Sequence, residues 1–267
     1  MADNDLDLSP DMFRSGANPK QTTILMQRRL QGPTNRDVSY SEVGENALFE
    51  GDIVLATMEE VKAAEQAAES KGIGIIGANF RWPGGTVPFV IATEAVRSRV
   101  EGAIAHWQER TPFTFVKRTT EAGFISFEER DGCWSRVGHQ GVKQVISLAP
   151  GCGLGSAIHE IGHAIGLWHE QSRSDRDDHI EIVAANINPI AIHNFDKHIL
   201  DGKDLGDYDF GSIMHYPATA FSINGQATIR VKGGAPIGQR TGLSAGDINA
   251  VRLMYPSLDW SQHSATT

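Results

Sequence analysis

One short segment, from residue 159 to residue 169, constrains this chain more than any other feature. It reads HEIGHAIGLWH. On a helix, residues four apart lie one turn apart on the same face, so His159 and His163 can direct their ring nitrogens at one point. Gly166 can end that helix in a left-handed turn, after which His169 returns to the same point. The segment therefore predicts a helix whose end supplies three imidazole ligands to one metal ion.

Glu160 follows the first histidine and gives this site a reactive group. Three imidazoles leave one position of a tetrahedral zinc ion open to water, and zinc lowers the pKa of such a water to about 7. A carboxylate beside the ligands can accept the proton of this water and pass it to a leaving amine. Histidines scattered on an ordinary helix are the alternative, but the spacing of all the fixed positions favours metal-assisted hydrolysis.

A second segment, SIMHYP at residues 212–217, gains a chemical role only beside the first. Alone it is typical of a turn with an apolar plug. Next to three imidazoles, the soft side chain of Met214 can form an apolar floor. The phenol of Tyr216 can reach the metal or the oxyanion of a tetrahedral intermediate.

Charge and hydropathy exclude several classes of partner. The formal net charge of −9 argues against nucleic acid or an anionic membrane surface. No stretch approaches the ~18 uninterrupted apolar residues of a membrane-spanning helix, so we expect no membrane insertion. The acidic N-terminus lacks the features of a secretory signal, so either the protein stays inside the cell or a signal was removed.

The N-terminal part differs from the rest in charge and in hydrophobic periodicity. Residues 1–72 hold 7 basic and 13 acidic side chains, and residues 1–48 show little periodicity, so we expect them to be mostly irregular. The run 47–56 is strand-like, and Thr57 with Glu60 forms a capping box for a helix that extends to residue 70. The glycine-flanked run 71–74 then predicts a domain boundary.

Residues 73–258 show the pattern of predicted strands and helices that is typical of a folded domain. The order of its predicted elements is β-α-β-β-β-α, followed by an irregular part closed by a helix, which indicates an α+β fold. Thr93 is expected to cap the first helix, and Ser244 with Asp247 the last. Strands are predicted at 87–91, 113–117, 124–127 and 144–149, and helices at 93–107, 156–168 and 244–255. Residues 259–267 are expected to form a C-terminal tail.

The sequence resembles the metzincins and, within them, the astacin family. The segments that carry the resemblance are HEIGHAIGLWHEQSRSDRD (159–177), SIMHYP (212–217), RWPGGTVPF (81–89), DGCWSRVG (131–138) and IGQRTGLSAGD (237–247). Together they span roughly residues 73–258. The resemblance implies a zincin-like protease domain with a twisted mixed sheet, a zinc helix and an irregular C-terminal subdomain, preceded by a pro-segment at residues 1–72.

Carried over residue by residue, the resemblance implies a catalytic centre. His159, His163 and His169 would bind one Zn²⁺ per chain, and Glu160 would be the general base. Tyr216 would be a displaceable fifth ligand that stabilises the transition state.

The resemblance also assigns supporting residues. Met214 would form the Met-turn, and Glu170 would engage the new N-terminus after cleavage, unless it is an ordinary surface carboxylate. Astacin pro-segments carry F-x-G-D, which here is FEGD at residues 49–52. Asp52 would therefore occupy the zinc in the latent form only, unless it belongs to an ordinary turn.

Two further features are less fixed by the residues themselves. Composition leaves open whether the two cysteines are free or paired, and the resemblance implies a disulfide between Cys133 and Cys152. The resemblance also places Arg240 in the pocket for the residue after the scissile bond, where it would favour Asp or Glu. A surface arginine is the alternative.

These observations predict a zinc metalloendopeptidase that cleaves proteins or peptides. We expect a secreted monomer, kept latent until an activating protease cuts near residues 70–78. We expect the substrate to pair with an exposed strand edge around residues 124–127. Two alternatives remain: a zinc-stabilised binding or inhibitory protein without turnover, and a narrow processing enzyme whose pro-segment is also a partner-binding arm.

Overall fold

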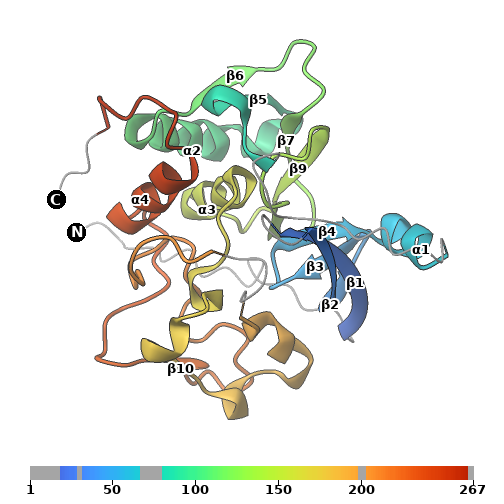
Figure 1. Ribbon diagram of the computed structural model, residues 1–267, viewed down its shortest axis with the longest axis vertical. Helices are drawn as coiled ribbons and strands as arrows, with labels where there is room; N and C mark the ends of the chain where they lie inside the picture. The colour runs from blue at the N-terminus through green and yellow to red at the C-terminus, as the bar shows by residue number, and fades with distance from the viewer. Residues whose placement is uncertain (1–18, 29–31, 67–79, 198–202, 264–267) are drawn as a thin grey trace.

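The computed structural model describes residues 19–28, 32–66, 80–197 and 203–263, and the side chains within 39–62, 80–197 and 203–263. The helix α3 lies at the centre of the molecule (Figure 1). A five-stranded sheet and helix α2 lie on one side of it, an irregular C-terminal part on the opposite side, and a four-stranded N-terminal sheet with α1 beside it. The predicted α+β class is confirmed.

The five-stranded sheet has the order β6-β5-β7-β9-β8. Only β8 runs antiparallel to its neighbour. Its strands are β5 (Thr86–Ile91), β6 (Thr114–Lys117), β7 (Phe124–Glu128), β8 (Cys133–Trp134) and β9 (Lys143–Leu148), and all four predicted strands are among them. The expected substrate edge at 124–127 is wrong, because β7 is paired on both sides and the sheet ends at β6 and β8.

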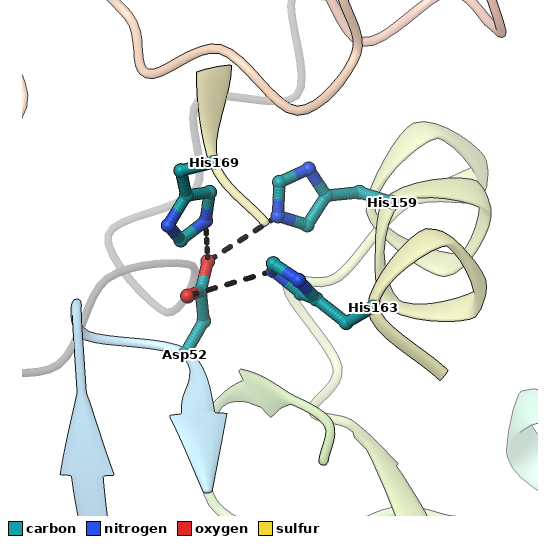
Figure 2. Close-up of side chains that lie close together, drawn as sticks. All are labelled: Asp52, His159, His163 and His169. Atoms are coloured by element: carbon teal, nitrogen blue, oxygen red, sulfur yellow. Dashed lines mark hydrogen bonds and ion pairs between the residues drawn. The ribbon is translucent and has the colours of Figure 1, made fainter. Parts of the chain in front are cut away.

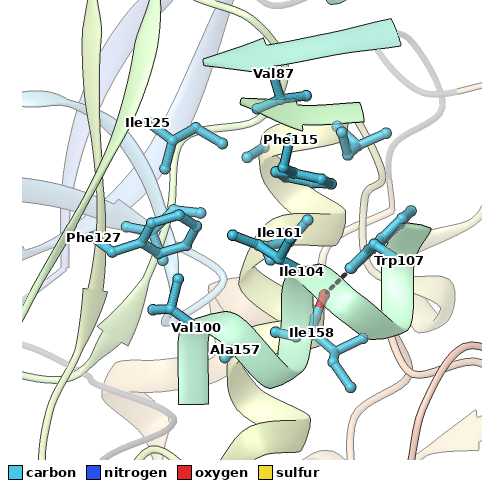
Figure 3. Close-up of a cluster of buried hydrophobic side chains, with 14 of the residues drawn as sticks. Val87, Val100, Ile104, Trp107, Phe115, Ile125, Phe127, Ala157, Ile158 and Ile161 are labelled. Atoms are coloured by element: carbon cyan, nitrogen blue, oxygen red, sulfur yellow. Dashed lines mark hydrogen bonds between the residues drawn. The ribbon is translucent and has the colours of Figure 1, made fainter. Parts of the chain in front are cut away.

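Helix α2 (Arg97–Arg110) follows the 3-10 turn η3 (Glu94–Val96) and packs against both α3 and this sheet. The apolar face expected from its sequence is buried. Trp107 Nε1 donates a hydrogen bond of 3.1 Å to Ile158 O in α3, which ties the two helices together (Figure 3). The predicted cap is wrong, because the Thr93 hydroxyl instead accepts from the backbone N–H of Glu129 at 3.2 Å.

Helix α3 (Leu154–Ile165) is buried from Gly155 onward. A helix enclosed on every side must be apolar almost all round, and α3 is, except for Ser156 and the residues of the candidate site. Gly166 ends it as predicted, with a φ of 123° that disfavours any residue with a Cβ. Gly166 N–H donates to His163 O at 2.8 Å, which closes the last turn.

The C-terminal part contains little regular structure until its last helix. Its strands β10 (Ile180–Ile182) and β11 (Ile229–Val231) form an antiparallel pair. Its closing helix α4 (Ala245–Met254) begins at the predicted capping box, in which Ser244 Oγ accepts from Asp247 N–H. The short 3-10 turns are η2 (Pro83–Gly85) before β5, and η4 (Glu170–Ser172), η5 (Arg176–Asp178), η6 (Ala184–Asn186) and η7 (Pro189–Phe195) in the C-terminal part.

The N-terminal segment, here residues 19–66, forms an antiparallel sheet in the order β1-β2-β3-β4. The expectation of irregular structure up to residue 48 is therefore wrong from residue 19 onward. Paired strands satisfy their backbone hydrogen bonds whether or not the side chains form an apolar face. The polar sequence of this segment therefore did not indicate strands. The elements are β1 (Pro19–Arg28), β2 (Gly32–Val43), β3 (Asn46–Phe49), β4 (Ile53–Thr57) and α1 (Met58–Gln66).

The strand-like run 47–56 is two strands rather than one. The chain reverses between β3 and β4 through Glu50 and Gly51, whose φ angles are 50° and 80°. Thr57 and Glu60 form the predicted capping box, since each backbone N–H donates to the other's side chain, at 2.8 and 3.1 Å. The predicted boundary at residue 72 lies outside the described residues.

Two further features bear on the sequence analysis. A disulfide joins Cys133 in β8 to Cys152, just before α3. Within the described ranges, none of the helices combines the length and the apolarity needed to cross a lipid bilayer.

Candidate metal centre

The three histidines of the segment 159–169 converge on one carboxylate. Asp52, at the turn between β3 and β4, lies between them (Figure 2). Its Oδ2 lies 3.4 Å from His159 Nε2 and 3.2 Å from His169 Nε2, and its Oδ1 lies 3.8 Å from His163 Nε2. All four side chains are buried. The structure thus brings together the four residues predicted as metal ligands in the latent form.

Backbone carbonyls orient two of the rings. His159 Nδ1 lies 2.8 Å from Ile213 O, and His163 Nδ1 lies 2.8 Å from Leu167 O. A neutral imidazole whose Nδ1 donates a proton has an unprotonated Nε2, which is the form that binds a metal. Both carbonyls therefore direct the Nε2 lone pairs at the point occupied by Asp52.

The N-terminal segment orients the third ring. His169 Nδ1 lies 2.7 Å from Oε2 of Glu50, which is buried at the turn before Asp52. The other carboxylate oxygen of Glu50 accepts from the Ser172 hydroxyl, and its backbone carbonyl accepts from the Tyr216 phenol. Glu50 escaped the sequence analysis because only the tertiary structure brings it to His169. The only indication in the sequence was that Glu50 is a second carboxylate two residues before Asp52.

These residues fit a zinc ion. The four candidate ligand atoms lie within 4.8 Å of one another. Among the described residues, Asp52 Oδ1, His159 Nε2 and His163 Nε2 are buried without a hydrogen-bond partner, a costly arrangement that a bound cation would relieve. Imidazole nitrogens with a carboxylate oxygen are a donor set that zinc accepts.

The electrostatics of His159 and His163 agree with that fit. At His169, in contrast, the effect of burial is outweighed by Asp52 and Glu50, which raise the pKa of this ring to about 9. Burial lowers the pKa of His159 to about 4, with a contribution from the charge of Arg240, and burial also lowers the pKa of His163. Both rings are thus neutral at physiological pH. Burial opposes the charge of Asp52 and is the largest single effect, but the attraction of His169 and the hydrogen bonds and charges of the three histidines together outweigh it. They hold the pKa of this carboxyl below its usual value.

Glu160 lies on α3 beside His159 and is fully buried. Neither of its carboxylate oxygens has a hydrogen-bond partner among the described residues. Burial, together with the nearby charge of Asp52, raises the pKa of Glu160 well above its ordinary value. A buried carboxyl next to a metal site, with a raised pKa and no hydrogen-bond partner, can accept a proton from a molecule that binds at the site.

Met214 lies beneath the zinc helix. Its side chain is buried, and a Cβ added to Gly162 would lie only 2.7 Å from its sulfur atom. The thioether therefore packs against α3 at Gly162, next to the turn that carries His159 and His163. Tyr216 also lies near the ligands, since its ring centroid is 4.6 Å from that of His169.

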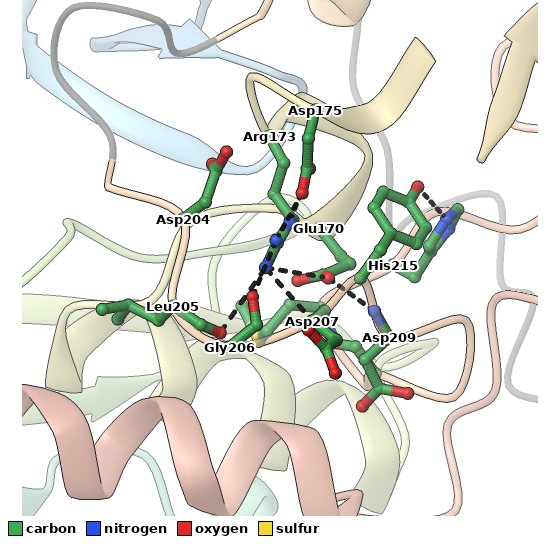
Figure 4. Close-up of polar contacts among 12 residues, drawn as sticks. Glu170, Arg173, Asp175, Asp204, Leu205, Gly206, Asp207, Asp209 and His215 are labelled. Carbon is green, nitrogen blue, oxygen red and sulfur yellow. Dashed lines mark hydrogen bonds and ion pairs between the residues drawn. The ribbon is translucent and has the colours of Figure 1, made fainter. Parts of the chain in front are cut away.

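Glu170 lies in a polar network with Arg173 and Asp209 (Figure 4). Its Oε1 accepts from Asp209 N–H at 2.8 Å and lies 3.5 Å from Arg173 Nη1. Burial raises the pKa of Glu170 to about 8. The new N-terminus that it is predicted to engage lies outside the described residues.

Arg240 is not among the ligands but packs next to the zinc helix. It is buried, and its Nη1 donates to His215 O at 3.0 Å and to Gln239 O at 2.8 Å. Its backbone contacts the start of α3 so closely that a Cβ on Gly155 would lie 1.9 Å from Arg240 O. The alternative of an exposed surface arginine is therefore wrong, whereas its role in specificity stays a prediction.

Comparison with known proteins gives this site a context. Residues 75–256 match the family profile "Astacin (Peptidase family M12A)". Protein SpAN of Strongylocentrotus purpuratus is 34% identical over 259 residues, which cover 89% of this chain and 41% of that protein. Tolloid-like protein 1 of Homo sapiens is 42% identical over 188 residues, which cover 65% of this chain and 19% of that protein. The chain thus spans less than half the length of either relative.

A solved structure resembles the folded domain. It is high choriolytic enzyme 1, a hatching enzyme zinc-protease from Oryzias latipes, with a TM-score of 0.64 and 37% sequence identity. The match covers 68% of this chain and 97% of that chain. Since the family profile spans most of the chain and nearly all of a solved zinc-protease aligns with it, this chain belongs to the astacin family, peptidase family M12A.

Proposed function

We propose that this chain is a zinc metalloendopeptidase held latent by its own N-terminal segment. One observation carries the proposal: three histidine Nε2 atoms and the carboxylate of Asp52 meet at one buried point, with all four ligand atoms within 4.8 Å of one another. His159, His163 and His169 hold the metal in both states, and Asp52 completes the set in the latent state. Because all four come from one chain, we expect one Zn²⁺ per chain and a monomer.

The reaction is hydrolysis of a peptide bond within a protein substrate. When bound by the three histidines, zinc would polarise the scissile carbonyl and lower the pKa of a neighbouring water molecule. Glu160 accepts the proton of the attacking water and donates it to the leaving amine. The phenol of Tyr216 turns from Glu50 to the oxyanion once the N-terminal segment has left. Met214 keeps the floor of the site apolar.

Latency follows from where the N-terminal segment lies. Asp52 occupies the position that water and the substrate carbonyl need, and Glu50 holds the side chains of His169, Ser172 and Tyr216. We propose that cleavage by an activating protease near residues 70–78 releases residues 1–72 as a pro-segment. Glu170 would then bind the new N-terminus, for which its buried carboxyl is available once ionised.

Location and specificity belong to the same proposal. The disulfide between Cys133 and Cys152 supports an oxidising, extracellular compartment. The position of Arg240, buried against the start of α3 that carries His159, is compatible with a preference for an acidic residue after the scissile bond.

Limited proteolysis near residue 72, followed by an assay on a protein substrate, tests this function. The processed chain should contain one zinc per chain and cleave the substrate, and a chelator should abolish the activity. Glu160→Gln should lower kcat by about 10²–10⁴-fold without loss of zinc. The exposed Glu109→Gln, in α2 of the domain that remains after processing, is the matched control and should change nothing. A processed chain that binds zinc but retains full activity with Glu160→Gln would exclude the proposed mechanism.

The latency switch needs its own test. The unprocessed Asp52→Ala chain should show activity that the unprocessed wild type lacks. Full latency of that variant, with zinc bound, would show that residue 52 is not the switch.

A further inference from the structure

The N-terminal segment lies along the edge of the five-stranded sheet that is formed by β8. Val54 N–H donates to Ser135 O at 2.8 Å, and Ser135 N–H donates to Asp52 O at 2.9 Å. Ser135 directly follows β8, the edge strand that pairs only with β9. A polypeptide that pairs with Ser135 therefore arrives at the metal centre within one or two residues, as Asp52 does.

Arg136, the next residue along this edge, is held by the N-terminal segment. Its Nη2 donates to Glu60 Oε2 of α1 at 2.8 Å. Its side chain is 21% exposed, so the arginine is partly buried on this edge. Within the described part of the chain, Glu60 is the only residue to which the side chain of Arg136 makes a hydrogen bond or an ion pair.

Arg130, a nearby arginine, differs from Arg136 in its partners. Arg130 also pairs with the N-terminal segment, through Glu45. Unlike Arg136, however, Arg130 has partners in the protease domain itself, since its Nε lies 2.8 Å from Glu128 and its guanidinium lies over the ring of Trp134. Release of residues 1–72 leaves Arg130 paired, but leaves Arg136 without its carboxylate.

The side chains along this edge alternate between two faces. Trp134 packs with Val54 in one cluster, whereas Val137 packs with Ile53 in another. Since successive side chains of an extended chain point to opposite faces, Arg136 shares the face of Trp134 and Val54. A peptide that replaces residues 52–54 on this edge presents alternate side chains to the same face.

We propose that Arg136 forms a subsite for an Asp or Glu side chain of the substrate, a few residues from the scissile bond, which Glu60 fills in the latent chain. The inference rests on the proposed function and adds to it a second acidic preference, separate from the one assigned to Arg240. A guanidinium binds a carboxylate through charge-assisted, often bidentate hydrogen bonds, and a lysine reproduces only the charge.

Binding of paired peptides tests the subsite without requiring turnover. The probe is the full chain with Glu160→Gln, processed near residue 72, and peptides that differ only by Asp against Asn at successive positions before and after the scissile bond. At one position outside the Arg240 pocket, the Asp peptide should bind about three- to tenfold more tightly. Arg136→Gln should abolish this ratio, and Arg136→Lys should retain part of it.

Arg230→Gln is the matched control, because Arg230 is also paired with a single glutamate, Glu181, at 2.8 Å. It should leave the ratio unchanged. A ratio that survives Arg136→Gln, or the absence of any such ratio outside the Arg240 pocket, overturns the subsite. Failure of the enzyme is seen separately, as a processed wild-type chain that binds these peptides but cleaves none of them.

Discussion

The carboxylate of Glu50 lies 2.7 Å from Nδ1 of His169, on the opposite side of the ring from Asp52. The N-terminal segment thus contacts this histidine at both nitrogens. Glu50 has a φ of 50°, a left-handed conformation that a glycine adopts at lower cost. A glutamate at such a position indicates that its side chain, rather than its backbone, matters there.

We predict that Glu50 contributes to latency independently of Asp52. Glu50→Gln removes the charge that holds His169 and Ser172, and Glu50→Gly removes the side chain while relaxing the turn. Each should raise the residual activity of the unprocessed chain about tenfold, because a hydrogen bond to a charged group is worth roughly 1.5–3 kcal/mol. Residual peptidase activity before proteolysis measures this effect. Glu59→Gln should stay fully latent, and a fully latent Glu50→Gly chain would contradict the prediction.

Gly162 should not tolerate a side chain. Because a Cβ at this position would lie 2.7 Å from the sulfur of Met214, Gly162→Ala should cost about 1–3 kcal/mol of stability. It should also weaken zinc binding by displacing α3 from the Met-turn. Denaturant unfolding and zinc titration give the two readouts.

Gly102 in α2 is the matched control for Gly162. A Cβ there meets only the end of the Leu154 side chain, with Cδ1 at 3.0 Å, and this leucine is 47% exposed and can move aside. Since alanine favours a helix over glycine by about 0.5–1 kcal/mol, Gly102→Ala should be neutral or stabilising. Equal losses at both glycines would mean that contact with Met214 is not the cause.

The disulfide should stabilise the domain substantially. Cys133 and Cys152 are 19 residues apart, and closing a loop of this size contributes about 3 kcal/mol. Replacing both with serine should therefore lower the free energy of unfolding by about this amount. A reducing agent should lower the wild type to the same value and leave the double variant unchanged, since the chain has no other cysteine.

His106 should make the domain sensitive to acid. Its Nε2 accepts from Leu243 N–H at 2.9 Å, which requires a neutral ring, and burial lowers its pKa below the ordinary value of 6.5. A base with a lowered pKa stabilises the fold above its ordinary pKa, and this contribution is lost as the pH falls through the folded value.

Glutamine at position 106 can accept the same hydrogen bond without titrating. His106→Gln should therefore reduce the loss of unfolding free energy between pH 7.5 and 5, by less than about 1 kcal/mol because the ring is only half-buried. Arg230→Gln, on an exposed side chain that does not titrate in this range, should follow the wild-type profile. An identical acid response in wild type and His106→Gln would exclude this role.

The sequence by itself determined the local features of this protein. The spacing of His159, His163 and His169 needs only a helix and a glycine turn to predict a common ligand point, and such turns form from nearby residues. The capping boxes at Thr57 and Ser244 are equally local. Four strands of the five-stranded sheet, β5, β6, β7 and β9, were visible because a buried sheet requires apolar runs.

Tertiary structure decided what depends on contacts between distant segments. The sequences of β1 and β2 lack the alternation of apolar residues that would predict strands. The position of β7 inside the sheet, rather than at its edge, depends on which strands pair with it. The approach of Glu50 to His169 and of Glu60 to Arg136 joins residues that are 119 and 76 positions apart. A periodicity in sequence reports burial of one face of one element, whereas these contacts arise only when whole elements pack together.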